Sequence, residues 1–239
     1  MAFDDGDRTA RPELATGSVA ERPSVQEKLE ESERQRRRLA RELQHRVKNI
    51  LASIRSLANL TFDESSDLAG FHERFDGRLQ ALCRFQASLG FGSNASVDLK
   101  ELIVDEFLAH AARLDRDVKV EGPDLALEPR AAQAFALVIH ELTSHAVHHG
   151  ALASEAGRIS VTWRLEHIDG TQTLALEWHE TGVQASEDMR RSAFGKHLIE
   201  AVLPYELGGS ARIEQVADDY RCIVEIPCND QIRPTEQER

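Results

Sequence analysis

The chain of 239 residues lacks several features that would narrow its class at once. It has no apolar run near the roughly 18 to 20 residues that span a bilayer, and its acidic start, Met1–Asp5, does not resemble a signal peptide. Its three cysteines are odd in number and form no CxxC pair, which favours reduced thiols over disulfides or a zinc knuckle. We therefore expect a cytoplasmic protein that does not bind a membrane.

Net positive charge is also missing from the chain. The formal charge of -12 argues against nonspecific binding to nucleic acids or anionic membranes. One basic cluster, Arg34–Arg38, lies in a stretch that is also rich in glutamate, so a solvated helical face explains it better than a binding patch. We expect no nucleic-acid partner.

The first part of the chain divides into a leader and two helices. Residues 1–23 mix Gly, Pro, Ser, Thr and charge without apolar periodicity, which predicts a disordered leader. One long helix is predicted from Ser24 to Leu60, where Ser24 and Glu27 form a capping box at its start. The polar segment Asp63–Asp67 ends it, and a second amphipathic helix follows, which predicts a helical hairpin.

Both helices of the hairpin carry an apolar seam at steps of three and four residues. A lone hairpin cannot bury both seams well, whereas two hairpins side by side form a four-helix bundle with a continuous core. We therefore predict a homodimer through residues 24–91. The seam residues are Leu39, Leu43, Val47, Ile50, Ile54 and Leu57 in the first helix and Phe71, Phe75, Leu79, Leu82, Phe85 and Leu89 in the second.

One histidine of the first helix lies on the wrong side for packing. His45 projects roughly opposite the apolar seam, with Asn49 one turn further on and Lys48 on the same polar half of the helix. A protruding imidazole with polar neighbours is suited to chemistry with another macromolecule. We therefore predict that His45 is the reactive residue.

The remainder of the chain predicts a second domain, at 95–228, of mixed helices and strands. Gly90–Asn94 is predicted as the hinge before it, and 229–239 as a polar tail. The pattern predicts an α+β protein whose second domain is an α/β sandwich with helices on one face of a sheet. Helices are predicted at 98–113, 129–149 and 194–203, and strands at 118–121, 158–166, 173–179, 211–215 and 221–226.

The motifs and their order resemble the HWE-type sensor histidine kinases. The phosphoacceptor block of that family is similar to His45-Arg-Val-Lys-Asn49, and its hairpin return to Phe75–Leu82. The histidine and the Trp-x-Glu that name the subfamily resemble His140 in His-Glu-Leu and Trp178-His-Glu180. The resemblance covers nearly all of residues 35–228, and the ordered combination is far more specific than any single motif.

The resemblance implies phosphoryl transfer through His45, either from ATP or to and from an aspartate of a response-regulator receiver domain. Arg46 and Lys48 would supply positive potential to the phosphate, and Asn49 could orient water for phosphatase action. The receiver is expected to dock around Arg46–Ile54 and on the facing second helix, and an upstream sensor protein is a further expected partner. The second domain would be of the GHKL ATPase type with ATP and Mg²⁺ as cofactors. Its implied nucleotide-site residues are His140, Glu141, His145, Trp178, Glu180, Gly182, Phe194 and Gly195.

The nucleotide motifs depart from the family pattern at several positions. His145 stands where the family has the asparagine that helps to hold magnesium, and an imidazole nitrogen is a poor substitute for an oxygen ligand of Mg²⁺. His148 and His149 replace a lysine and a tyrosine. Val183-Gln184 replaces Gly-Pro, and Ala193 replaces the first glycine of Gly-Phe-Gly. Such turns hold phosphates through backbone amides that need glycine conformations, so these changes predict a degenerate ATP site.

A metal site is the rival interpretation of the histidines. His145 and His149 are one turn apart and could present a Zn²⁺ or Ni²⁺ edge, but no HExxH is present and a third ligand would have to come from elsewhere. Our prediction names no metal ligands.

Three functional hypotheses follow from the sequence. The first is a phosphotransferase or phosphatase that exchanges phosphate between His45 and receiver aspartates with weak or absent ATP activity. The second is an ATP-dependent autokinase that tolerates His145. The third is a scaffold that binds a regulator without phosphorylation.

Overall fold

The computed structural model describes residues 25–63, 65, 67–88, 96–110, 118–183, 195–216 and 219–235. The chain forms two compact units, Met1–Ala52 and Ser53–Arg239. The predicted leader and hinge, at 1–23 and 90–94, lie outside the described residues. In the part of the chain that is described, no helix combines the length and apolar character needed to cross a membrane.

Helix α1 (Val25–Asp63) supplies all the described structure of the first unit. Its surface carries ion pairs one turn apart, Arg34 with Glu30 at 3.4 Å and Arg37 with Glu33 at 3.2 Å, as expected for a solvated helical face. The predicted seam is exposed along this part of the helix: Leu39, Leu43 and Val47 are 51%, 62% and 54% exposed. An apolar row this exposed is available to a partner.

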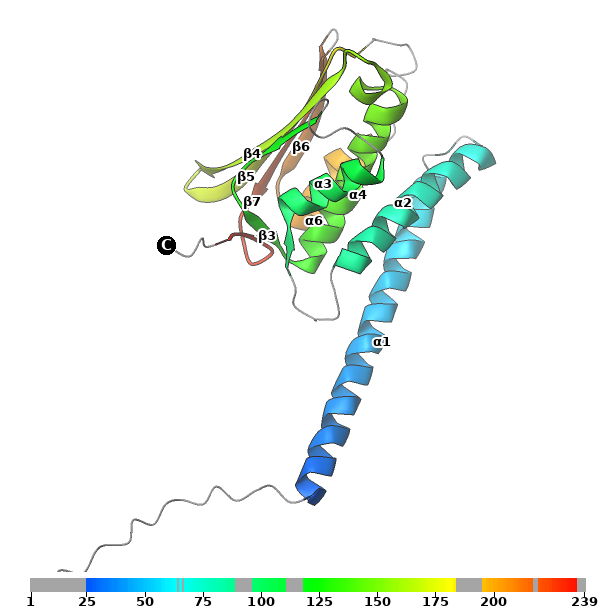
Figure 1. Cartoon of the computed structure of the whole chain (residues 1–239), viewed down its shortest axis with the longest axis vertical. Helices are drawn as coiled ribbons and strands as arrows, with labels where there is room; N and C mark the ends of the chain where they lie inside the picture. Colours follow the sequence, from blue (N-terminus) through cyan, green and yellow to red (C-terminus); the bar gives the residue numbers. More distant parts are fainter. Residues whose placement is uncertain are drawn as a thin grey trace, which may run out of the picture. The chain divides into compact units, whose positions relative to one another are not determined.

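The second unit begins with the last turns of α1 and continues into α2 (Leu68–Ser88) (Figure 1). Ala81, Leu82 and Phe85 of α2 are buried, and the helix packs against α4 (Pro129–His148). The sequence analysis placed a domain boundary between 91 and 95, whereas α2 groups with the sheet in a single compact unit.

A five-stranded sheet in the order β2-β4-β5-β7-β6 forms the centre of this unit. Strands β2 and β4 are parallel, and all other neighbours are antiparallel. The Asp169-Gly170 turn joins β4 to β5 with positive φ at both residues, the requirement of a tight hairpin turn. The strands are β2 (Val118–Glu121), β4 (Arg158–Ile168), β5 (Thr171–Thr181), β6 (Ser210–Val216) and β7 (Asp219–Pro227).

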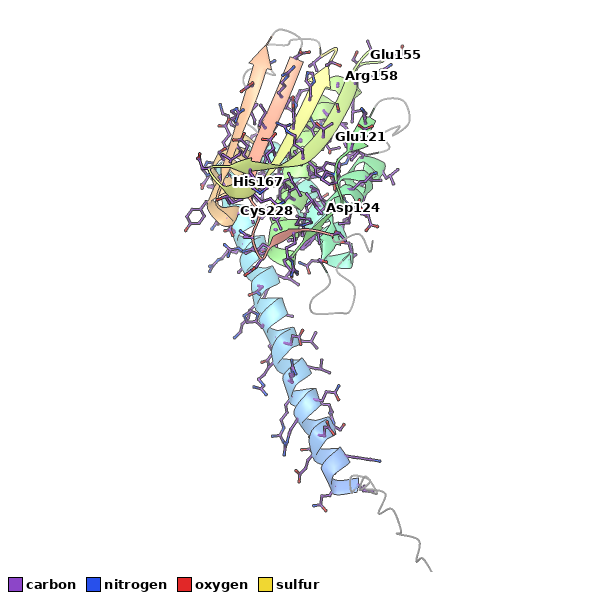
Figure 2. All side chains as sticks on the ribbon, turned by 90° about the vertical axis from the view of Figure 1, so that its left-hand side faces the viewer. Glu121, Asp124, Glu155, Arg158, His167 and Cys228 are labelled. Carbon is purple, nitrogen blue, oxygen red and sulfur yellow. The ribbon has the colours of Figure 1, made fainter. Side chains whose placement is uncertain are left out.

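The ends of the sheet can be followed in Figure 2. Glu155 and Arg158 lie where β4 begins, and His167 and Cys228 lie at the opposite end. Alternate residues along β4 face the core, with Ile159, Val161 and Trp163 buried, so a solvated face remains on the other side. All three cysteines are free, as predicted.

Helices cover one face of the sheet, which confirms the predicted sandwich (Figure 1). Helix α3 (Leu99–Ala109) begins at Asp98, whose carboxylate accepts the backbone N–H groups of Lys100 and Glu101. Helix α4 begins with a proline in its first turn. The helix predicted at 194–203 is present in the described residues from 196 onward, with a π-helical turn, Leu198–Val202, and it continues into α6 (Leu203–Leu207).

A second, small sheet in the order β1-β3-β8 was not predicted. It is formed by β1 (Val97–Asp98), β3 (Leu125–Leu127) and β8 (Ile232–Pro234), all antiparallel. The tail predicted from residue 229 therefore contains a strand, because Ile232 is buried in the core and fixes it there.

Candidate functional site

The predicted phosphoacceptor lies on the described part of the first unit. His45 is exposed on α1, as predicted, and its Nδ1 is 3.3 Å from the Asn49 amide nitrogen, one turn away. Lys48 is exposed beside them, whereas the side chain of Arg46 lies outside what the structure describes. The helix therefore brings His45 and Asn49 together and leaves the imidazole accessible to another macromolecule.

This contact links Asn49 to the tautomer of His45. An amide N–H donates, so in this orientation Nδ1 accepts and Nε2 carries the proton of the neutral ring. If the amide turns over, its oxygen accepts from Nδ1–H, and Nε2 holds the lone pair that a nucleophile needs. The amide at position 49 can therefore select which ring nitrogen reacts.

Glu141, a predicted nucleotide-site residue on α4, is engaged with α2. Its Oε1 accepts from Arg78 Nε at 2.6 Å, and both side chains are fully buried. Arg78 also donates from Nη1 to the Thr61 hydroxyl at 2.9 Å. The other carboxylate oxygen, Oε2, is buried without a hydrogen-bond partner. Arg78 of α2 therefore pairs with one oxygen of the Glu141 carboxylate, and the other oxygen has no hydrogen-bond partner.

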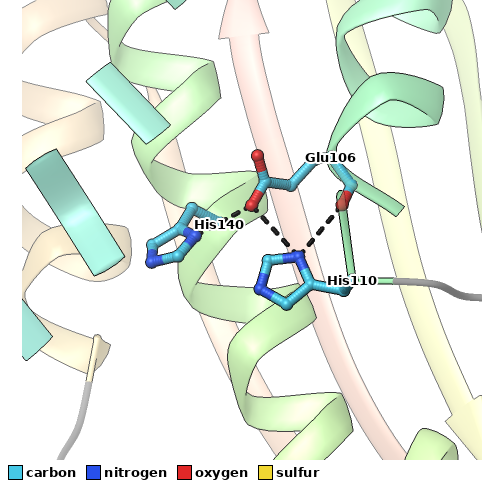
Figure 3. Close-up of side chains that lie close together, drawn as sticks. All are labelled: Glu106, His110 and His140. Carbon is cyan, nitrogen blue, oxygen red and sulfur yellow. Dashed lines mark hydrogen bonds and ion pairs between the residues drawn. The ribbon is translucent and has the colours of Figure 1, made fainter. Parts of the chain in front are cut away.

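His140 takes part in a second polar cluster, with Glu106 of α3 and His110 after it (Figure 3), and Arg84 of α2 joins this cluster. Its Nδ1 lies 2.8 Å from Glu106 Oε1, and Arg84 of α2 donates to both oxygens of the same carboxylate at 2.7 Å. His110 Nδ1 lies 3.0 Å from the Glu106 backbone oxygen. Burial raises the pKa of Glu106, but the hydrogen bonds and charges of His140 and Arg84 outweigh this, so its pKa is lowered from the ordinary value of 4.5.

The cluster around Glu106 is also a candidate metal site. Among the described residues, Glu106, His110 and His140 form the group whose ligand atoms lie within 4.8 Å of one another. The Arg84 guanidinium, however, already holds both Glu106 oxygens and places a fixed positive charge where a cation would bind. The cluster is thus explained as a hydrogen-bonded ion network. It does not include His145 or His149, the pair of possible metal ligands considered from the sequence.

Glu180 of the Trp-x-Glu motif is fully buried and paired on both oxygens. Oε1 accepts from the Trp178 indole N–H at 2.9 Å, and Oε2 accepts from the backbone N–H of Ala151 at 2.7 Å. The Trp178 ring stacks on Phe107 with centroids 5.2 Å apart. The motif therefore anchors β5 to the end of α4, and Gly150 leaves room for this, since a Cβ there would meet Glu180.

His145 is buried and stacks on Tyr220, with ring centroids 4.5 Å apart. Its Nδ1 makes no hydrogen bond in the described structure, and the nearest Glu180 oxygen is 3.7 Å away. His148 and His149 are exposed at the end of α4, and the rings of His145 and His149 have centroids 5.9 Å apart. His145 therefore fills the space beside β7 with an aromatic ring.

The glycines of the predicted site keep special conformations. Gly182 and Gly195 both have positive φ, 69° and 70°. A Cβ at Gly195 would lie 2.9 Å from Glu141 Oε2, so this glycine allows the backbone close to the carboxylate. Phe194 lies outside the described residues.

Two residues of these networks, Arg78 and Glu106, were not singled out in the sequence analysis. Each stands at a position of its helix that the apolar spacing assigns to the buried face: Arg78 lies between Phe75 and Leu82, and Glu106 follows Ile103 by three residues. A charged residue at a seam position signals a buried partner on another element. That signal was present in the sequence.

Comparison with known proteins tests the family resemblance. The family model described as HWE histidine kinase matches residues 42–124. A blue-light-activated histidine kinase of Rhizobium johnstonii is 30% identical over 199 residues, which cover 83% of this chain and 55% of that protein. Over residues 42–124 the chain matches the HWE histidine kinase family. The resemblance read from its motifs is thereby confirmed.

Other relatives show how much of such a kinase is present in this chain. A protein of the same name from Brucella ovis is 28% identical over 197 residues, 82% of this chain and 40% of its own length. The chain thus spans about half the length of the curated relatives it matches. A solved blue-light-activated histidine kinase of Erythrobacter litoralis aligns with a TM-score of 0.53 at 19% identity, over 82% of this chain and 64% of that one. The chain shares that fold.

Proposed function

We propose that the chain exchanges a phosphoryl group between His45 and an aspartate of a response-regulator receiver domain, as a phosphotransferase or phosphatase, with weak or absent use of ATP. The observation that carries this proposal is a contrast in accessibility. His45 and Asn49 are exposed together on α1, whereas His140 and Glu141 of α4 are buried and paired with charged residues of α2 and α3.

The proposed phosphoryl transfer requires few protein groups besides His45. In the transfer direction, a neutral ring nitrogen attacks phosphorus, the P–N bond forms and the P–O bond to the aspartate breaks. The second ring nitrogen then releases its proton to water. The neutral imidazole already carries a lone pair on one ring nitrogen, so no separate base is required to prepare the nucleophile. Lys48 lies close enough along the helix to offset the charge of the phosphate.

Asn49 would serve the phosphatase direction. Its amide is one turn from His45, so it can place a water molecule beside an aspartyl phosphate docked on the same face. Attack by that water breaks the P–O bond and releases inorganic phosphate, and the water's proton passes to solvent or phosphate. We propose that the receiver docks within the first unit on α1 beside His45, where Val47, Lys48, Asn49, Leu51 and Ala52 are exposed.

The described donor set of α4 and β5 does not fit Mg²⁺, which prefers oxygen ligands in tight octahedral geometry. His145 offers nitrogen, one oxygen of Glu141 is bound by Arg78, and both Glu180 oxygens accept protein hydrogen bonds. No step of the proposed reaction therefore uses ATP. In this proposal the sandwich domain serves as a docking surface and not as an ATPase.

The proposed active form is a homodimer. The exposed apolar row of α1 at Leu39, Leu43 and Val47 has the spacing of a helix–helix seam. A second copy would cover it in a four-helix bundle while leaving His45 on the outside. Input is proposed to arrive from a sensor, since the curated relatives are named blue-light-activated.

The test uses receiver domains loaded with radiolabelled phosphate from acetyl phosphate. Each is mixed with the full chain, the His45→Ala variant or the Asn49→Ala variant. We expect label to leave a receiver in the presence of the wild type and not with His45→Ala if transfer operates. Loss of label as free phosphate that depends on Asn49 indicates the phosphatase direction. Receivers that bind but keep their label would establish scaffolding and contradict the proposal.

The family match favours one second candidate, an ATP-dependent autokinase. Incubation with γ-labelled ATP and Mg²⁺ or Mn²⁺ tests it, with His45→Ala as control and His145→Asn as the variant with a restored oxygen ligand. Acid-labile label on the wild type that is lost in His45→Ala would establish the autokinase. Label on His145→Asn alone would support the inactive nucleotide site.

A further inference from the structure

A row of basic side chains on α1 leads to His45 from the N-terminal side of the helix. Its members follow one another at steps of four and three residues, which places them along one helical face. They are Arg34, Arg38, Arg41, His45 and Lys48. We propose that Arg38 and Arg41 bind the phosphoryl group that His45 exchanges and the acidic receiver surface that carries it. The inference rests on the proposed function and adds to it contacts on the N-terminal side of His45.

The basic row and the exposed apolar row lie on different sides of α1. At about 100° per residue, Arg38 and Arg41 project away from the side that carries Leu43 and Val47. Both arginines are exposed, as is His45. A second copy that covers the apolar row therefore leaves the basic row in water, where a partner can reach it.

The direction of the side chains places the phosphoryl group beside these arginines. Side chains of a helix lean toward its N-terminus, so each covers the turn that precedes its own Cα. The 3.3 Å contact between the Asn49 amide nitrogen and His45 Nδ1 shows this lean one turn after the histidine. Since Nδ1 faces Asn49, Nε2 is the ring nitrogen left for phosphorus. The same lean directs the imidazole toward Arg41, and Arg38 stands one turn further along.

Arg38 and Arg41 keep a positive charge that no carboxylate of the described residues neutralises. Their neighbour Arg37 pairs with Glu33 at 3.2 Å, whereas Arg38, Arg41 and Lys48 form no ion pair within the described part of the chain. Arg41 Nε donates to the backbone oxygen of Arg37 at 3.2 Å, which holds the guanidinium beside the helix and leaves its two terminal nitrogens to face a ligand. A solvated face of paired charges therefore explains Arg37 and does not explain Arg38 or Arg41.

The charge of this segment is opposite to that of the chain. Residues 34–52 carry seven basic side chains and one acidic one, whereas the whole chain has 29 basic and 41 acidic residues. An acidic partner is therefore attracted to this segment more than to the remainder of the surface. A guanidinium can bind a phosphate or carboxylate through two parallel hydrogen bonds, which an ammonium group cannot do. The partner chemistry that fits is a phosphoryl group on a protein surface rich in carboxylates.

Radiolabelled phosphoramidate tests phosphate binding by the arginines without any receiver. His45 attacks its phosphorus, the P–N bond of the reagent breaks, ammonia leaves, and a ring proton of the histidine passes to water. Acid-labile label is measured on the full chain, and His45→Ala gives the background from the other histidines. We expect the loading rate of Arg41→Gln to fall at least about fivefold, because charge-assisted hydrogen bonds to the phosphoryl group are lost.

Arg36→Gln is the matched control for Arg41→Gln. It removes the same charge from an exposed position of α1 that projects to the other side of the helix from Arg38. Its loading rate should stay within about 1.5-fold of wild type, because water and salt screen a charge on the far side. Arg41→Lys keeps the charge but not the planar fork, so it should recover only part of the rate. Circular dichroism should show equal helix content in all variants.

Receiver domains loaded with radiolabelled phosphate from acetyl phosphate test the partner surface. Below saturation, the rate at which a receiver loses label to the chain should fall at least about tenfold in the double variant Arg38→Gln with Arg41→Gln, since steering and phosphate contacts are both lost. Added salt should slow the wild type more steeply than this variant.

Two results would overturn the inference. One is phosphoramidate loading that Arg41→Gln leaves unchanged, and the other is an equal loss of loading in Arg36→Gln and Arg41→Gln, which would show a general attraction of anions to the helix. Loading that depends on Arg41, without label exchange with any receiver, would support phosphate binding by this row and reject the proposed function alone.

Discussion

Helix α1 carries the predicted phosphoacceptor residues and helix α4 carries predicted nucleotide-site residues. The polar side chains of these two sets differ in exposure. On α1, His45 and Asn49 contact each other and are otherwise exposed. On α4, His140 and Glu141 are buried and bound by charged groups of neighbouring helices. The comparison teaches that a family motif can be retained for packing in one element and for surface chemistry in another.

The largest expected effect lies on the buried side of this comparison. Trp178→Ala should lower the free energy of unfolding by about 3–5 kcal/mol, the usual cost of removing a large buried aromatic side chain. The change removes the stack on Phe107 and the indole donor to Glu180. Urea unfolding measures it.

Trp178→Phe is the matched control for that experiment. It keeps the ring but leaves Glu180 Oε1 without its indole donor, so a loss of about 1–3 kcal/mol is expected. A wild-type unfolding curve for Trp178→Ala would show that the Trp-x-Glu motif does not anchor β5.

The next largest effect is pH-dependent and concerns Glu106. Its pKa is lowered in the folded state, so the unfolded chain takes up this proton first as the pH falls. Its contribution to stability is therefore complete above about pH 4.5 and is lost as the pH falls through the lower, folded pKa. Glu106→Gln should cost about 1–3 kcal/mol at pH 7.

The difference between wild type and Glu106→Gln should shrink in acid. Urea unfolding at pH 7, 5 and 4 and in more acidic buffers measures it. A difference that grows as the pH falls would contradict the assigned ion network. Glu166→Gln on the exposed part of β4 is the control, since an exposed ion pair contributes only about 0–1 kcal/mol.

Much of the fold could be predicted because local spacing determines it. The helices at α1, α2, α3 and α4 and the long strands of the main sheet follow from apolar periodicity. The three-residue strands β3 and β8 could not be predicted in this way, since their pairing joins segments more than 100 residues apart. The same limit applies to the site: His45 with Asn49 is a one-turn relation, whereas Arg78 with Glu141 depends on tertiary packing.

A smaller effect is expected where the nucleotide motif departs from its family. His145→Asn removes the stack on Tyr220 and should cost about 0.5–1.5 kcal/mol of unfolding free energy. It also introduces an amide oxygen. Thermal unfolding with and without Mg·ATP measures both changes, and a larger nucleotide-induced stabilisation in wild type than in the variant would contradict the degenerate site.

The smallest stability effect belongs to the exposed side. His45→Gln should change the free energy of unfolding by no more than about 0.5 kcal/mol, because an exposed side chain away from caps and buried networks contributes little. Asn49→Ala should behave alike. A loss of unfolding free energy above about 2 kcal/mol in either variant would show that the residue packs in the interior. It would then not differ from His140 and Glu141 of α4.

The most direct test of the central claim is to offer one preparation of the chain labelled phosphate from two sources, receiver aspartyl phosphate and γ-labelled Mg·ATP, and to measure acid-labile label on His45. The account predicts that label from the receiver reaches His45 or is released as inorganic phosphate, that none above background comes from ATP, and that His45→Ala acquires none from either source. Label from ATP with none from any receiver would contradict it.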